Sequence, residues 1–155
     1  MLEDYKADSG SFEPVYTLEI QTLEDDVDRI LDGIMRVHPL NYGRYLRNAS
    51  VSATGWETTI PQENSTTTNH KKGYQLGTPM SYPCVELKIS IERDLDALQR
   101  VMDVILELHH YEQPVIFLRE DWASRSNYDP HRNNPNRWWN TEKGLPRELS
   151  KEKRR

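Results

Sequence analysis

Ionisable side chains gather near residue 110, where an apolar helical pattern gives way to a short strand pattern. His109 and His110 are followed by Tyr111 and Glu112. Imidazole and carboxylate groups suit zinc, copper or nickel, so His109, His110 and Glu112 are candidate ligands of a divalent metal. Because neighbouring side chains on a helix point about 100° apart, both imidazoles reach one ion only if the turn bends back.

Two other uses of the same residues remain open. In a structural role, His109 caps the C-terminus of a helix, where a cation is favoured, while Tyr111 packs and Glu112 forms an ion pair. In a small enzyme, His109 and Glu112 serve as acid and base together with groups from a long loop. The enzyme requires two titratable groups in one pocket, whereas a binding site requires only a cleft and a mobile loop.

A second candidate site, for a small ligand, follows from residues in the first half of the chain. Ser50 and Ser52 alternate onto the polar face of a predicted strand, and Arg44 and Arg47 precede them. Guanidinium and hydroxyl groups can line an anion pocket, and Tyr111 joins them as a candidate ligand contact. Burial against a neighbouring subunit is the alternative use of this polar face.

Two further features carry chemistry of their own. Cys84 is the only cysteine, which excludes an intrachain disulfide and a cysteine-based structural zinc site. We interpret it as a small buried side chain, because a nucleophile would need a base such as His38 or His109 beside it. Trp138 and Trp139 stand in a polar segment, and we expect them to dock on the chain's own sheet or a second copy, or to contact a partner protein.

Alternating and helical apolar patterns define the elements that must position these residues. Thr22 and Asp94 are the predicted N-caps of the two helices. The predicted strands and helices cover, in chain order, residues 15–21, 22–38, 45–53, 84–91, 94–108 and 115–118. This order of strand, helix, strand, strand, helix, strand predicts a ferredoxin-like α+β sandwich, with an antiparallel sheet that carries two helices on one face.

The remaining chain divides into a long polar loop and two flanking segments. We assign residues 1–14 to a flexible arm, 15–118 to the ferredoxin-like domain and 119–155 to a C-terminal extension, while 57–83 form the loop. The length of 155 residues suits one domain. A formal net charge of −5 argues against a general nucleic-acid binder. Without an apolar stretch of about 20 residues or a leader pattern, we expect no membrane association and a cytoplasmic location.

The segment from His109 to Pro114 resembles the H-P-Y-E-x-P signature of two related groups. One is the CutA divalent-cation-tolerance family, and the other is the ferredoxin-like domain inserted in NIF-three-like proteins. His109, Tyr111-Glu112 and Pro114 match the signature, and His110 replaces its first proline. An earlier segment is similar in order and spacing to the inserted domain, through Gly43, Tyr45, Ala49-Ser50-Val51-Ser52, Gly55 and Pro61.

The resemblance covers residues 15–118 and implies a CutA-like or PII-like domain. CutA proteins are trimers linked with metal tolerance and share their fold with the PII signalling proteins. The two-metal site of NIF-three-like proteins lies in a flanking domain that this chain is too short to hold. We therefore expect a non-catalytic oligomeric binding or regulatory module, preferably a trimer, with a small ligand or divalent metal at subunit clefts. A small enzyme and a structural partner-binding protein are the alternatives.

Overall fold

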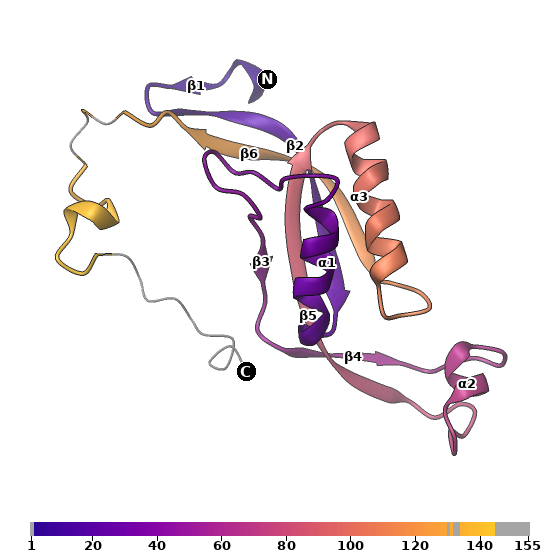
Figure 1. The fold of residues 1–155 in the computed structure, drawn as a ribbon. Coiled ribbons are helices and arrows are strands. Elements are labelled where there is room, and N and C mark those ends of the chain that lie inside the picture. Colours follow the sequence, from indigo (N-terminus) through magenta and orange to yellow (C-terminus); the bar gives the residue numbers. More distant parts are fainter. Residues whose placement is uncertain (1, 130, 132–133, 145–155) are drawn as a thin grey trace.

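The computed structural model describes residues 2–129, 131 and 134–144, and it is built on two long central strands (Figure 1). The strands are β1 (Lys6–Ala7), β2 (Gly10–Thr22), β3 (Ser50–Val51), β4 (Gly55–Thr59), β5 (Met80–Glu92) and β6 (Ile116–Ser126). The helices are α1 (Val27–Ile34), α2 (Thr66–His70) and α3 (Leu95–Leu108), with short 3₁₀ turns at Leu2–Asp4, Glu24–Asp26 and Trp138–Asn140.

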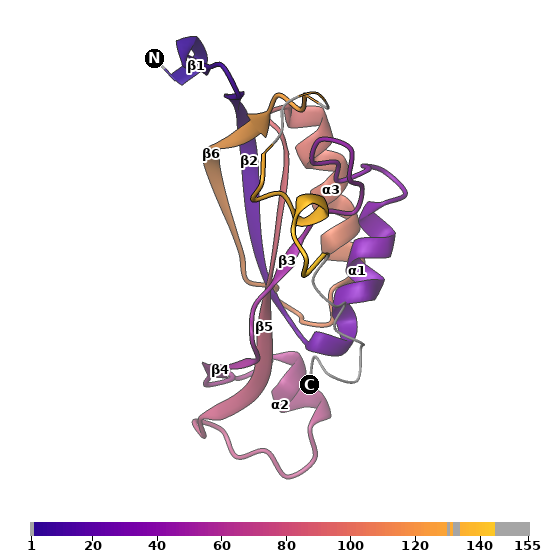
Figure 2. The same ribbon diagram turned by 90° about the vertical axis from the view of Figure 1, so that its left-hand side faces the viewer.

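The sheet is antiparallel throughout. β2 and β5 lie side by side at its centre, β6 pairs with the other edge of β2, and β3 and β4 pair with β5. Helices α1 and α3 pack against each other on one face of this sheet (Figure 2). The ferredoxin-like α+β sandwich predicted from the sequence is thus confirmed.

The core lies between the two helices and the sheet. The β2–β5 register pairs Leu18 with Ile89 and Ile20 with Leu87, so that their side chains share the face beneath the helices. Ile30 of α1 is fully buried against them. Burying a side chain of this size contributes about 1.5–3 kcal/mol, so this shared face stabilises the β2–β5 register against a one-residue slip.

The prediction of a strand over residues 45–53 is wrong for most of that segment. Only Ser50–Val51 pairs with β5, while Tyr45 and Leu46 lie exposed in the loop that precedes it. Leu40 and Arg47 have positive φ angles of 49° and 55°, which end any extended run. The apolar alternation in this segment therefore does not report a half-buried strand.

Several boundaries also differ from the sequence prediction. β2 begins at Gly10 rather than at residue 15, and β6 extends to Ser126 rather than ending at 118. These extensions pair with each other from Gly10 opposite Ser126 onward, beyond the helices, where a strand needs no apolar face. Thr22 belongs to β2 and caps no helix, whereas Asp94 caps α3 by accepting a hydrogen bond from the Ala97 N–H at 2.7 Å.

Candidate functional site

The segment predicted as a long loop forms an arm, defined here as Gly55–Pro83, that projects from one end of the sheet (Figure 1). Strand β4 pairs with the first residues of β5, from Gly55 opposite Cys84 to Thr59 opposite Met80. Helix α2 lies at the tip. The Tyr74 hydroxyl donates to the carbonyl oxygens of Thr78 and Pro61, at 3.0 and 3.3 Å. The arm is thus a braced hairpin rather than an irregular loop.

The residues from His109 to Pro114, which we call the corner, join α3 to β6. His109 is the C-cap residue of α3, and its Nδ1 accepts a hydrogen bond from the Tyr111 N–H at 3.1 Å. The proton of the ring therefore lies on Nε2, which is 2.8 Å from the Gln21 carbonyl oxygen and donates to it. An uncharged imidazole thus ties the corner to the end of β2, with both nitrogens occupied.

A second histidine makes the same arrangement after the first helix. His38 follows α1, and its Nδ1 accepts from the Leu40 N–H at 3.0 Å, two residues further on, as in the corner. Its Nε2 lies 2.6 Å from a carboxylate oxygen of Glu92 at the end of β5. The two histidines occupy equivalent places in the repeated strand–helix unit, and each connects the chain after its helix to the central strand of the other unit.

Glu112 points from the corner to the tip of the arm. One of its carboxylate oxygens accepts from the Thr66 N–H at 2.9 Å and from the Thr66 hydroxyl at 2.8 Å. These two hydrogen bonds lower the pKa of Glu112, the backbone N–H having the larger effect. Glu112 therefore remains ionised at neutral pH, which does not suit a general acid.

Tyr111 is turned inward beneath the arm. Its hydroxyl oxygen is buried without a hydrogen bond of acceptable geometry, and so is one carboxylate oxygen of Glu57. Burial raises the pKa of Tyr111 to about 12, and the nearby charges of Glu57 and Cys84 add to the rise. Burial also raises the pKa of the Cys84 thiol, and the negative charges of Glu57 and Glu86 raise it further. A buried protonated thiol is a poor nucleophile.

The three candidate metal ligands point to different partners. His109 is directed to β2 and Glu112 to α2, while the exposed His110 ring has its Nδ1 3.9 Å from a carboxylate oxygen of Asp26. Within the part of the chain that the structure describes, no three His, Cys, Asp or Glu side chains converge as a metal site requires. A metal held by the corner would first have to break its hydrogen bonds.

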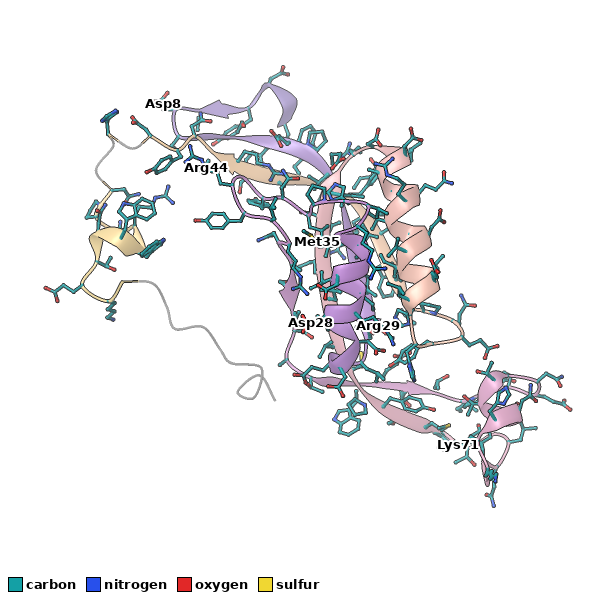
Figure 3. The ribbon with its side chains drawn as sticks, in the orientation of Figure 1. Asp8, Asp28, Arg29, Met35, Arg44 and Lys71 are labelled. Carbon is teal, nitrogen blue, oxygen red and sulfur yellow. The ribbon has the colours of Figure 1, made fainter. Side chains whose placement is uncertain are left out.

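The candidate anion-binding residues do not converge either. Arg47 forms ion pairs at 2.9 Å with Asp28 and Asp32 of α1, and Figure 3 places Asp28 on that helix. The guanidinium of Arg44 instead lies 5.3 Å from the centre of the Tyr128 ring. Ser52 and Ser50 lie on the sheet edge, where the Ser52 hydroxyl accepts from the Glu86 N–H at 2.9 Å and donates to the Ala53 carbonyl at the same distance. Tyr111 lies near Glu57 and Cys84 instead of these arginine and serine side chains.

Two hollows are better candidates for a ligand. A cavity of about 470 Å³ at the base of the arm has walls from both the arm and the sheet. It is lined by Gln21, Ser52, Ala53, Gly55, Trp56, Glu57, Thr58, Cys84 and Glu86. A groove of about 480 Å³ crosses the sheet face opposite the helices, with Ser50, Lys88 and Arg119 among its lining residues. Sequence reasoning missed the first, although Trp56 in a polar stretch was a signal for it.

The tryptophan pair does not dock on the sheet. The rings of Trp138 and Trp139 pack against each other at 5.7 Å, and Trp139 contacts the Tyr128 ring at 6.2 Å. The two tryptophans remain 44% and 48% exposed. This aromatic cluster (Tyr128, Trp138 and Trp139) is therefore a half-exposed surface, which leaves contact with a second copy or a partner protein as its candidate roles.

Comparison with known proteins supports the fold. No protein family model and no curated protein matches the sequence. A Bacillus cereus protein related to NIF3 shares the fold with a TM-score of 0.55 and 15% identity over 70% of this chain. The chain spans only 26% of the length of that protein. The fold resemblance inferred from the motifs is thereby confirmed.

Two further structures are similar at lower scores. The divalent ion tolerance protein CutA1 from Ehrlichia chaffeensis gives a TM-score of 0.49 at 13% identity, with 69% of this chain and 80% of that chain covered. GlnK from B. subtilis gives 0.44 at 12% identity, with 70% and 86% covered. In the described residues, no helix is long and apolar enough to cross a bilayer.

The His109 contacts predict a structural effect that His110 does not share. We expect His109→Ala to lower the free energy of unfolding by about 1–3 kcal/mol, because a backbone carbonyl and a backbone N–H lose their partner. His110→Ala, at an exposed position, should change it by less than about 0.5 kcal/mol. Urea denaturation followed by circular dichroism measures both values, and equal losses in the two variants would contradict the assignment.

The Tyr111 hydroxyl gives a prediction with a defined pH dependence. At pH 7 we expect Tyr111→Phe to leave stability unchanged or to raise it by up to about 1 kcal/mol, since the buried hydroxyl lies near Glu57 without a hydrogen bond of good geometry to lose. In the native chain burial raises the pKa of the Tyr111 hydroxyl to about 12, from an ordinary value of about 10. The neutral ring therefore favours folding up to about pH 10 and loses this advantage as the pH rises toward 12.

Denaturation of both proteins between pH 8 and 11 tests this dependence. The stability difference between Tyr111→Phe and the native chain should grow in favour of the variant above pH 10. A variant that is strongly destabilised at pH 7 would show that the hydroxyl makes an important hydrogen bond.

Proposed function

We propose that this chain is a non-catalytic, oligomeric binding or regulatory module, with three subunits and a small ligand held at clefts between them. The observation that carries the proposal is the unpaired edge of the sheet. Strand β6 pairs with β2 along its whole length, and in the described residues no strand pairs with its outer edge. Such an edge offers a row of hydrogen-bonding groups to another chain.

The side chains on this edge favour association. Phe117 and Leu118 are neighbours on β6 and therefore point to opposite faces, yet they are 55% and 48% exposed. An uncovered edge with exposed apolar side chains and unpaired backbone groups can pair with a strand of another chain. We favour three subunits over two because the sequence resembles the CutA family, whose members are trimers.

The absence of catalysis is proposed from how the titratable groups are used. His109 has both nitrogens engaged, Glu112 binds the arm, and the Cys84 thiol is buried. None of the three is placed to transfer a proton to or from a substrate. The acid–base function considered for His109 and Glu112 therefore has no support from their geometry.

The cavity at the base of the arm is the proposed ligand cleft. It combines the Trp56 ring, which is largely exposed, with the carboxylates of Glu57 and Glu86. A neighbouring subunit that covers Trp56 would close the open side of this cavity. A divalent metal remains an alternative ligand, and a neighbouring subunit would have to supply part of its ligands, because the described residues of one chain bring no three metal-binding side chains together.

The aromatic cluster supports a second candidate function, contact with a partner protein. Tryptophan is enriched among the residues that contribute most of the binding energy at protein interfaces. If this is their role, Trp138→Ala combined with Trp139→Ala should leave thermal stability and solution mass unchanged. A loss of mass on the same substitution would instead assign the cluster to self-association.

The assembly prediction is tested by measuring mass in solution. We expect light scattering coupled to size exclusion to give a trimer at micromolar concentration, and Phe117→Glu to give a monomer with an unchanged circular dichroism spectrum. Leu95→Glu is the matched control, because Leu95 is equally apolar and 70% exposed but lies at the start of α3. A monomeric native chain, or a Phe117→Glu variant that stays assembled, would contradict the proposal.

The ligand is tested by native mass spectrometry and elemental analysis of the protein as purified. We expect a small molecule or metal that stays with the native chain and is lost in Trp56→Ala. Retention of the same species by Trp56→Ala and its loss in His109→Ala would move the site to the corner.

A further inference from the structure

The arm is braced within itself. Five residue pairs join β4 to the beginning of β5, and Tyr74 closes the loop beyond α2 through its bonds to Pro61 and Thr78. The N-cap of α2 is also internal, since the Ser65 hydroxyl accepts from the Thr68 N–H at 3.2 Å. The β4–β5 pairs and the Tyr74 bonds therefore hold the hairpin together without help from the rest of the molecule, whereas α2 itself is only five residues long.

One carboxylate, that of Glu112, connects the tip of the arm to the rest of the molecule by hydrogen bonds. Glu112 of the corner accepts the two hydrogen bonds from Thr66, the first residue of α2. In the described part of the chain, the other hydrogen bonds of residues 60–79 stay inside the arm. Nearer the base, the Thr54 hydroxyl donates to Glu24 at 3.2 Å, and Tyr111 packs beside Glu57.

We propose that Glu112 and Thr66 form a releasable catch, and that the arm takes a second position when this catch opens. Both Glu112 and Thr66 are exposed, so water can replace each hydrogen bond. Helix α2 has only five residues, far fewer than a helix needs to persist on its own contacts. Loss of Glu112 therefore frees the tip from the body while the β4–β5 pairing and Tyr74 keep the arm together.

Opening the catch would change the cavity at the arm's base. Trp56, Glu57 and Thr58 move with β4, whereas Gln21 and Glu86 belong to the central strands. A change in the angle of the arm therefore alters the distance between the two walls. The catch requires neither the assembly nor the ligand of the proposed function, so each can fail without the other.

Hydrogen exchange of the full chain tests the catch without any label. We expect Glu112→Ala, and to a smaller extent Thr66→Val, to raise the exchange rate of the backbone amides of residues 66–70 severalfold. The amides of β2 and β5 in the core should keep their protection. Glu107→Ala is the matched control, because Glu107 is an exposed glutamate on the last turn of α3. Unchanged exchange in Glu112→Ala would overturn the proposal.

A distance measurement reports the position of the arm's tip directly. Spin labels at Lys71→Cys and Arg36→Cys, with Cys84→Ala and an excess of unlabelled chain, report the arm-to-body distance within one subunit. Lys71 lies at the tip of the arm (Figure 3), and Arg36 follows α1. We expect one narrow distribution with Glu112 present and a broadened or second distribution in Glu112→Ala. A distribution that stays narrow and unshifted would show that the arm does not move.

Discussion

The arrangement of the corner depends on the two hydrogen bonds of the His109 imidazole. By accepting from the Tyr111 N–H and donating to the Gln21 carbonyl, it fixes the turn after α3 against the end of β2. Tyr111 then faces inward to Glu57, and Glu112 reaches outward to Thr66. A ring whose nitrogens both serve the backbone stabilises the turn, and it has no lone pair left for a metal or a substrate proton.

His38 makes the equivalent contact in the first strand–helix unit of this chain. Each strand–helix unit ends with a histidine that accepts an N–H two residues later and donates to the end of the other unit's central strand. The two contacts lie at opposite ends of the β2–β5 pair. They hold the chain after each helix in place, so the segment 39–48 and the corner extend from fixed points toward the sheet edge and the arm.

Much of the fold could be predicted because one face of the sheet is covered. Apolar residues alternate over 84–91 because one face of β5 is covered by the helices. The apolar residues of α1 and α3 recur at helical spacing because they pack into the same core. Where strands run beyond the helices, as in β2 near Gly10 and β6 near Ser126, no face is buried and the pattern disappears. The segment 45–53 alternates, yet only Ser50–Val51 forms a strand, because the backbone turns at Arg47, whose side chain pairs with the carboxylates of α1.

The candidate site was predictable only in part. The sequence placed His109 at the end of a helix, but its two backbone partners depend on where β2 ends and on how the turn closes. The partner of Glu112 is 46 positions away, on an arm whose direction is set by the β4–β5 pairing. The structural role of the corner can be measured directly by two-bond ¹H–¹⁵N correlation spectra of the imidazole rings at pH 7, with and without equimolar zinc. We predict that His109 carries its proton on Nε2 and that zinc leaves its signals unchanged. A His109 ring that is protonated on Nδ1, or whose nitrogens shift when zinc is added, would contradict it.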